Sequence, residues 1–190
     1  MPAPKGEARQ AAIADAAIRL VAERGLRGLT HRAVDTEAGL PPGSTSYYLR
    51  TRDALLTACV RRMLQRDLED NPAPPATDLP ELLTGLVVGQ VTARRQDLLA
   101  RYELSLEAVR RPSLRTALVE AGARLRSGLA GLLASYGVAD AERAAGSVAG
   151  MLDGLMYDRV AGAGSEVSDA EFERSVRRAV DALLTGLIPR

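Results

Sequence analysis

Aromatic residues are scarce in this chain of 190 residues, which has no tryptophan, five tyrosines and Phe172 as its single phenylalanine. A core without large aromatic side chains has to be filled by leucine, valine and alanine, and such a composition favours helices. The hydrophobic share of 46% is sufficient for a core, and the length suits one large or two small domains.

Cysteine, histidine and long apolar runs are also rare. Cys59 is the only cysteine, which excludes an intrachain disulfide, and a lone His31 is a poor candidate for a metal ligand or a catalytic base. The stretch "LLTGLVVGQV" is too short to span a membrane and is interrupted by Thr84 and Gln90. Because "MPAPKGEARQ" at the start lacks the apolar run of a signal peptide, we expect a cytoplasmic protein, and we expect no metal or cofactor.

The charge of the chain is unevenly distributed, although its net value is only +1. Residues 1–66 carry 11 basic and 6 acidic side chains, a net of +5, whereas residues 67–190 carry 14 and 18, a net of −4. A basic front end of this kind is typical of a protein with an anionic partner such as nucleic acid.

Apolar periodicity predicts helices along the whole chain, and no segment shows the sustained alternation of a strand. The first helix is expected over 7–24, ending at Gly25, and the second over "HRAVDTEAG", capped by the hydroxyl of Thr30. A third short helix follows over about 42–49, and a longer one over about 52–70. Beyond the break "NPAPPATDLP", further helices are expected at about 79–94, 96–110, 112–136, 140–162 and 169–187.

The stretch "GLPPGSTSYYLRTRDALL", residues 39–56, is unusually rich in turn-forming and polar residues. Two short helices joined by a glycine-containing turn form a helix-turn-helix, whose second helix can enter the DNA major groove. Gly43 and Ser44 leave little bulk, and we expect free N–H groups at the helix start to face phosphates beside the flanking arginines. An ordinary connection between helices is the structural alternative.

The longer segment "LTHRAVDTEAGLPPGSTSYYLRTRDALL" resembles the TetR-type transcriptional regulators. Their hallmark is a Thr-capped second helix, then Ala-Gly-Val-Ser-x-Gly-Thr-Leu-Tyr-x-His-Phe and a basic residue that opens a long fourth helix. The match covers residues 7–56, and the remainder is similar in length and helical pattern. The resemblance implies an all-α fold of about nine helices: a three-helix helix-turn-helix domain over 1–52, and a helical bundle for effector binding and dimerisation over 53–190.

The resemblance also implies DNA contacts. The positions that resemble phosphate contacts are Thr30, Ser44, Tyr47 and Arg52, and those that resemble positions near base edges are Pro42, Ser44, Thr45 and Tyr48. The complete predicted set is Thr30, His31, Arg32, Pro42, Gly43, Ser44, Thr45, Tyr47, Tyr48, Arg50 and Arg52. Because the third helix has no Arg, Lys, Asn or Gln, we expect few direct hydrogen bonds to base edges. Arg50 at the helix end could be an exception.

Three residues depart from the family pattern. Asp35 stands where a small alanine usually packs, Ser46 where a tyrosine is usual, and Leu49 in place of phenylalanine. We therefore expect adjusted packing between the second and third helices, with Tyr47 and Tyr48 restoring the aromatic volume.

Two further signals lie in the second part of the chain. Gly146, Gly150 and Gly154 recur at every fourth position and form a smooth strip, which suits either a dimer seam or packing inside the protomer. Val180 and Leu184, in the apolar run of the last helix, complete the predicted seam. Cys59 lies in an apolar stripe, where a packed small hydrophobe is favoured over a redox sensor.

A small-molecule site is indicated by polar groups near apolar faces. Its predicted residues are Tyr102, Ser105, Met151, Leu155 and Tyr157. Tyrosines satisfied inside a core would produce the same pattern.

These observations predict a homodimeric repressor that a small-molecule effector of unknown identity releases from a palindromic operator in double-stranded DNA. No phosphate loop, nucleophile elbow or histidine-carboxylate cluster points to an enzyme, and no membrane partner is expected. Two alternatives stay open: a helical-bundle enzyme or small-molecule carrier without DNA binding, and a DNA-binding protein without an effector.

Overall fold

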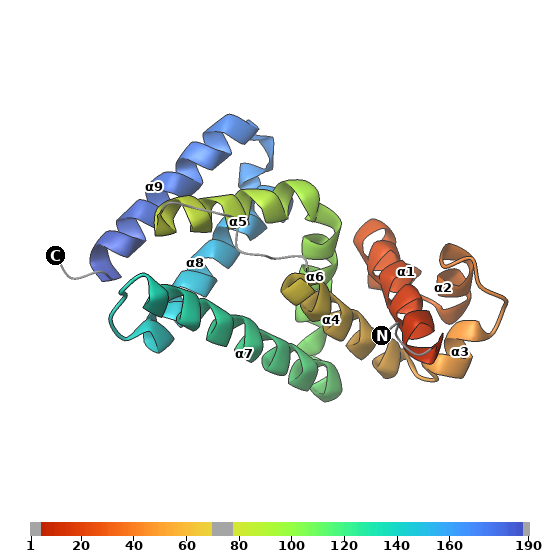
Figure 1. Ribbon diagram of the computed structural model, residues 1–190. Helices are drawn as coiled ribbons and strands as arrows, with labels where there is room; N and C mark the ends of the chain where they lie inside the picture. The colour runs from red at the N-terminus through yellow and green to blue at the C-terminus, as the bar shows by residue number, and fades with distance from the viewer. Residues whose placement is uncertain (1–4, 70–77, 188–190) are drawn as a thin grey trace. The chain divides into compact units, whose positions relative to one another are not determined.

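The computed structural model describes residues 5–69 and 78–187, and within these ranges the regular elements are all helical. The first four are α1 (Lys5–Gly28), α2 (His31–Glu37), α3 (Ser44–Tyr48) and α4 (Arg52–Glu69). They are followed by α5 (Leu79–Ala93), α6 (Arg95–Ala108), α7 (Pro112–Ser135), α8 (Ala141–Ala161), the short 3₁₀ helix η1 (Ala163–Glu166) and α9 (Asp169–Leu187) (Figure 1). The all-α prediction is confirmed. Most of the predicted break, "NPAPPAT" at 71–77, lies outside the described residues.

Local caps explain where several helices begin and end. The Ala33 N–H donates to the Thr30 hydroxyl at 3.1 Å, and the Glu81 N–H donates to the Asp78 carboxylate at 2.7 Å. Gly25 has φ 63° and ψ 179°, so the chain leaves the helical conformation there as predicted, but helical backbone resumes as far as Gly28.

One compact unit consists of α1 to α4 together with Leu99–Ala121. Within it, α1 packs against α2 and α4, and α2 packs against α3. Its largest fully buried side chains are Ile13, Ile18, Leu20, Val21, Leu29, Leu55, Leu56, Leu104 and Leu114. Cys59 is fully buried in this core, and burial raises its pKa to about 12, which agrees with a packed small hydrophobe.

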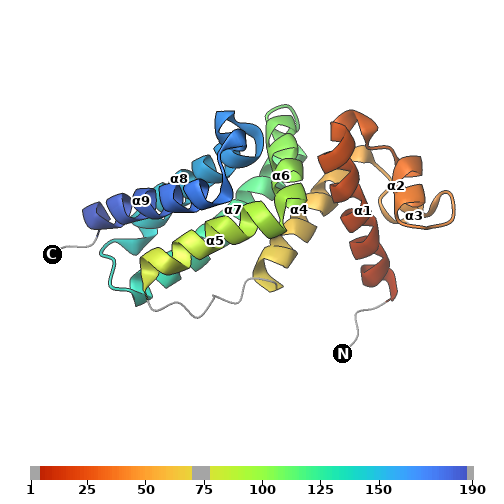
Figure 2. The same cartoon turned by 90° about the horizontal axis from the view of Figure 1, so that it is seen from above.

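The other compact unit contains the described residues 78–98 and 122–187. Here α5 packs against α8 and α9, and the three helices lie side by side in both views (Figures 1 and 2). The buried side chains of this unit include Leu82, Leu83, Val87, Leu133, Val148, Val176 and Val180. Helices α6 and α7 contribute residues to both units, and the domain division after residue 52 remains a prediction.

None of the helices in the described ranges has both the length and the apolar character that a membrane crossing requires.

Candidate nucleic-acid interface

The turn between α2 and α3 depends on two glycines in the left-handed region. Gly39 has φ 64° and Gly43 has φ 90°, conformations that strain residues with a Cβ atom. Across this turn, the Leu40 N–H donates to the Asp35 carbonyl at 2.8 Å, and the Ser44 N–H donates to the Pro41 carbonyl at 3.1 Å. These bonds close the turn and start α3 at Ser44. The predicted helix-turn-helix is therefore present.

Most of the predicted DNA-contacting residues lie on an exposed surface. The exposed members are Thr30, Arg32, Pro42, Gly43, Tyr47 and Arg50, and the half-buried ones are His31, Ser44, Tyr48 and Arg52. Tyr47 is 73% exposed and contacts Tyr48 edge to face, with the ring centroids 5.0 Å apart. Because only Tyr48 packs against the core, the expectation that both tyrosines restore the aromatic volume is wrong for Tyr47.

Asp35 links α2 to the start of α3. Its side chain accepts hydrogen bonds from the Thr45 N–H at 2.7 Å, the Thr45 hydroxyl at 2.6 Å and the Gly43 N–H at 2.7 Å. Asp35 is only 3% exposed and Thr45 is fully buried. A carboxylate from the preceding helix therefore caps α3, whose own N-cap residue, Gly43, has no side chain for this purpose.

Two expectations need correction here. The Gly43 and Thr45 N–H groups are bound to Asp35 and do not face outward to an anion. Thr45, expected near base edges, is buried with its hydroxyl bound to the same carboxylate. Asp35 and Thr45 thus form one buried polar pair. Sequence reasoning treated the two positions separately.

The charge of Asp35 should make the stability of this unit depend on pH. Burial acts to raise the pKa of Asp35, but the hydrogen bonds from Thr45 and Gly43, with the charge of His31, lower it below its ordinary value. The charged form therefore stabilises the fold above the unfolded pKa of about 3.9, and this contribution is lost as the pH falls through the lower folded pKa. Above that range it is constant.

We therefore predict a pH-dependent difference between the wild type and Asp35→Asn. Asparagine can still accept from Thr45, but its NH₂ group cannot accept from Gly43, and the free energy of unfolding should fall by about 1–3 kcal/mol at pH 7. Urea denaturation at pH values from 7 down to 3 should show the difference shrinking below about pH 4. A difference that stays constant to pH 3 would contradict the assignment.

His31 lies at the other end of α3. Its Nε2–H donates to the Leu49 carbonyl at 2.7 Å, so this nitrogen is occupied within the protein. His31 therefore has a structural role at the end of α3, which a lone histidine in the sequence does not reveal.

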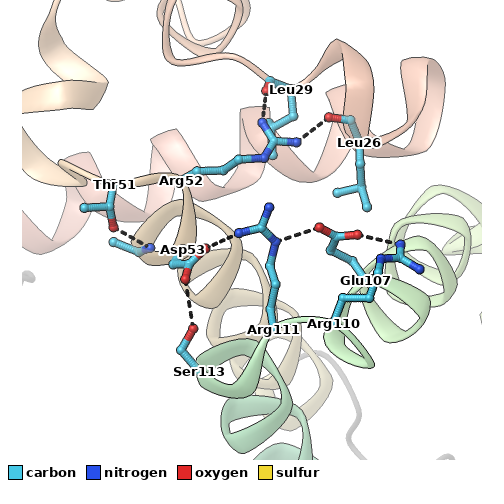
Figure 3. Close-up of polar contacts among 10 residues, drawn as sticks. Leu26, Leu29, Thr51, Arg52, Asp53, Glu107, Arg110, Arg111 and Ser113 are labelled. Carbon is cyan, nitrogen blue, oxygen red and sulfur yellow. Dashed lines mark hydrogen bonds and ion pairs between the residues drawn. The ribbon is translucent and has the colours of Figure 1, made fainter.

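Arg52 opens α4 and holds the link between α1 and α2. Its Nη1 donates to the Leu29 carbonyl at 2.6 Å and its Nη2 to the Leu26 carbonyl at 2.5 Å (Figure 3). These carbonyls belong to the end of α1 and the residue after it, where the helix leaves its acceptors without intrahelical partners. The guanidinium predicted to contact phosphate is thus already engaged with the backbone.

The residue after Arg52 joins α4 to the corner between α6 and α7. Arg111 donates from Nη1 to Asp53 and from Nε to Glu107, both at 2.6 Å (Figure 3). Ser113 donates to Asp53 at 3.3 Å, and Arg110 donates to Glu107 at 2.7 Å. The bonds from Arg111 and Arg110 lower the pKa of Glu107. Sequence reasoning missed this network, because Arg111 and Asp53 are 58 positions apart and no local pattern pairs them.

The predicted ligand-binding residues belong to different compact units. Tyr102 and Ser105 lie in the first, where the Tyr102 hydroxyl accepts from Arg101 at 3.1 Å and the Ser105 hydroxyl donates to the Arg101 carbonyl at 2.8 Å. Met151, Leu155 and Tyr157 lie in the second, where Tyr157 is 48% exposed. Their shared role as an effector site remains a prediction.

The glycine strip of α8 lies on the surface of the second unit. Gly146, Gly150 and Gly154 are exposed, and a Cβ atom added at any of them would meet nothing within 4 Å. Val180 and Leu184, in contrast, are 0% and 3% exposed. Their assignment to a dimer seam is therefore corrected: they face the core of the protomer, because the apolar face of α9 packs on α5 and α8.

An all-helical chain with a glycine-hinged helix-turn-helix near its start and further helices beyond it has the architecture of a helical DNA-binding regulator. Residues 74–189 match the family model described as "Tetracyclin repressor-like, C-terminal domain". The chain is also 31% identical over 153 residues to the HTH-type transcriptional regulator BetI of Rhizobium meliloti (strain 1021), across 77% of this chain and 75% of that one. The chain belongs to the TetR family of transcriptional regulators.

Solved structures share the fold. A transcriptional regulator from Rhodococcus sp. Rha1 is similar in fold, with a TM-score of 0.80 at 21% identity over 98% of this chain and all of that one. The multidrug binding protein EbrR, in complex with ethidium, has a TM-score of 0.69 at 31% identity, over 96% of this chain and 99% of that protein. The family and these relatives are regulators and binding proteins rather than enzymes.

Proposed function

We propose that this regulator is a homodimeric repressor that acts in the cytoplasm, binds a palindromic operator through α3 and leaves it when a small molecule binds. The observation that carries the proposal is the exposed outer face of α3, held by a glycine-hinged turn in the most basic part of the chain. Exposed Pro42, Tyr47 and Arg50 are the proposed contacts to DNA, together with exposed Thr30 and Arg32 at the start of α2.

The dimer would form through α8. The exposed glycine strip of that helix allows a second copy to approach closely, because no side chain covers its backbone. Two copies of α3 could then meet half-sites about 34 Å apart, one turn of DNA. The two-fold symmetry of such a dimer is the reason to expect a palindrome, and this spacing is the expected separation of its half-sites.

The effector is proposed to be a mostly apolar small molecule, because EbrR, a relative at 31% identity, is a multidrug binding protein that holds ethidium. The proposed contacts are Tyr102, Ser105, Met151, Leu155 and Tyr157. Ethidium can be tested by its fluorescence in the absence of DNA. It cannot be used to test release, because it intercalates into duplex DNA, so a non-intercalating molecule found by thermal-shift screening is required.

Effector binding is proposed to reach the DNA-binding helices through the corner between α6 and α7. Both helices contribute residues to both compact units, and their corner is bound to the first turn of α4 by Arg111. That contact is made by Asp53, and the residue just before it, Arg52, holds the link between α1 and α2. A shift of this corner would therefore move the first turn of α4, and with it the contacts of Arg52 to the link between α1 and α2.

Selection of bound duplexes from a random pool tests the proposed function. A palindromic consensus with half-sites one helical turn apart is expected, and its affinity should fall steeply with salt because phosphate contacts release counterions. Recovery of no consensus, or of a single asymmetric half-site, would contradict a dimeric operator-binding regulator.

A further inference from the structure

The helix α3 is too short to hold itself in place. It spans only Ser44–Tyr48, so nearly all of its backbone groups belong to a helix end and lack an intrahelical partner. An isolated helix of this length is unstable in water. Its orientation must therefore come from the groups that bind its two ends.

Both ends are bound by side chains of α2. Asp35 accepts from the Gly43 and Thr45 N–H groups at the start of α3, and His31 donates to the Leu49 carbonyl just after its end. His31 and Asp35 are one helical turn apart on α2, which places them on the same face. One face of α2 thus holds α3 at the start and at the end.

The bonds of Asp35 are not easily replaced by water. Asp35 and Thr45 are buried, so breaking their bonds would leave polar atoms without partners in the interior. Loss of Asp35 would therefore disturb the orientation of α3. The exposed side chains of Tyr47 and Arg50 would still be present.

We propose that Asp35 and His31 are positioning residues for sequence-specific DNA recognition, which hold α3 in the one orientation that reads the operator without touching the DNA themselves. The inference rests on the proposed function. It predicts that loss of either residue reduces discrimination between DNA sequences rather than attraction to DNA as such, because the phosphate-attracting charges of the surface remain.

The experiment compares two duplexes: the one selected from the random pool and one of the same composition in scrambled order. Fluorescence anisotropy gives the affinity of each variant for both, at one salt concentration and at a temperature where circular dichroism shows the variant folded. Asp35→Ala should lower the ratio of the two affinities by about tenfold, the discrimination that one good base contact supplies. Its affinity for the scrambled duplex should change little.

His31 gives a second test if Asp35→Ala does not fold. His31→Ala should lower the ratio, and His31→Gln should restore it, because an amide N–H can replace Nε2–H as donor to Leu49. Thr36→Val is the matched control on the same helix, since the Thr36 hydroxyl donates to the Arg32 carbonyl within α2 and not to α3. Its ratio should equal that of the wild type.

The outcomes distinguish failure of the proposed operator recognition from failure of the positioning role. A wild type that binds both duplexes equally would remove the proposed operator recognition. A selective wild type whose Asp35 and His31 variants lose affinity equally for both duplexes, with an unchanged ratio, would overturn the positioning role. A reduced salt slope for His31→Ala with an unchanged ratio would instead make His31 a phosphate contact.

Discussion

Gly150→Leu is expected to convert the protein from a dimer to a monomer and to lower its affinity for a full palindromic operator by about 10²- to 10⁴-fold, because binding to the second half-site is no longer intramolecular. Leucine is a better helix former than glycine, which costs roughly 0.8–1 kcal/mol relative to alanine, and the space around Gly150 in the protomer is open. The protomer should therefore stay folded. Sedimentation gives the mass, and anisotropy gives the affinity for a full operator and for a half-site.

Gly89→Leu is the matched control. Gly89 is also an exposed helical glycine with no atom within 4 Å of an added Cβ, but it lies on α5. It should gain the same helix propensity and remain a dimer with full operator affinity. A Gly150→Leu variant that stays dimeric would exclude α8 from the seam, and a monomeric Gly89→Leu would move the seam to α5.

Arg111→Ala is expected to leave operator binding largely intact while weakening the response to the effector. Coupling between two ligands is typically about 5- to 150-fold in either affinity, and it is reciprocal. Removing a residue on the coupling route should reduce that factor by roughly two- to thirtyfold. The stability cost should be small, because the side chains of Asp53 and Arg111 are partly exposed, at 48% and 31%. The measurement is operator affinity with and without a saturating, non-intercalating ligand.

Arg110→Ala is the matched control for Arg111→Ala. It removes the same positive charge but leaves the contact between Arg111 and Asp53 in place. Arg110 bonds to the same Glu107, which is on α6 and not on α4, and the Arg110 side chain is 69% exposed. The coupling of this variant should match the wild type. Equal loss of coupling in both variants would point to Glu107 or to net charge, and an unchanged Arg111→Ala would exclude the Asp53 contact as the route.

Much of the helical framework is determined by signals that act within a turn or two of the chain. The Thr30 hydroxyl caps α2 from its own neighbourhood, and Gly39 and Gly43 permit the backbone conformations of the turn. The apolar stripe through Leu55, Leu56, Cys59, Val60 and Met63 identifies the face of α4 that is buried. Because these interactions are local, the sequence by itself determined the helices, their order and the helix-turn-helix.

The tertiary structure was needed wherever a side chain's partner lies far away in the chain. Arg111 meets Asp53 across 58 positions and Arg52 reaches Leu26 across 26, and no periodic pattern specifies such pairs. An apolar stripe likewise does not say whether it faces the protomer's own core or a second copy, which is why Val180 and Leu184 were assigned to the wrong side. At Asp35 the sequence shows only a charged residue in an apolar place, and the fold brings Gly43 and Thr45 to its carboxylate because α2 and α3 pack together.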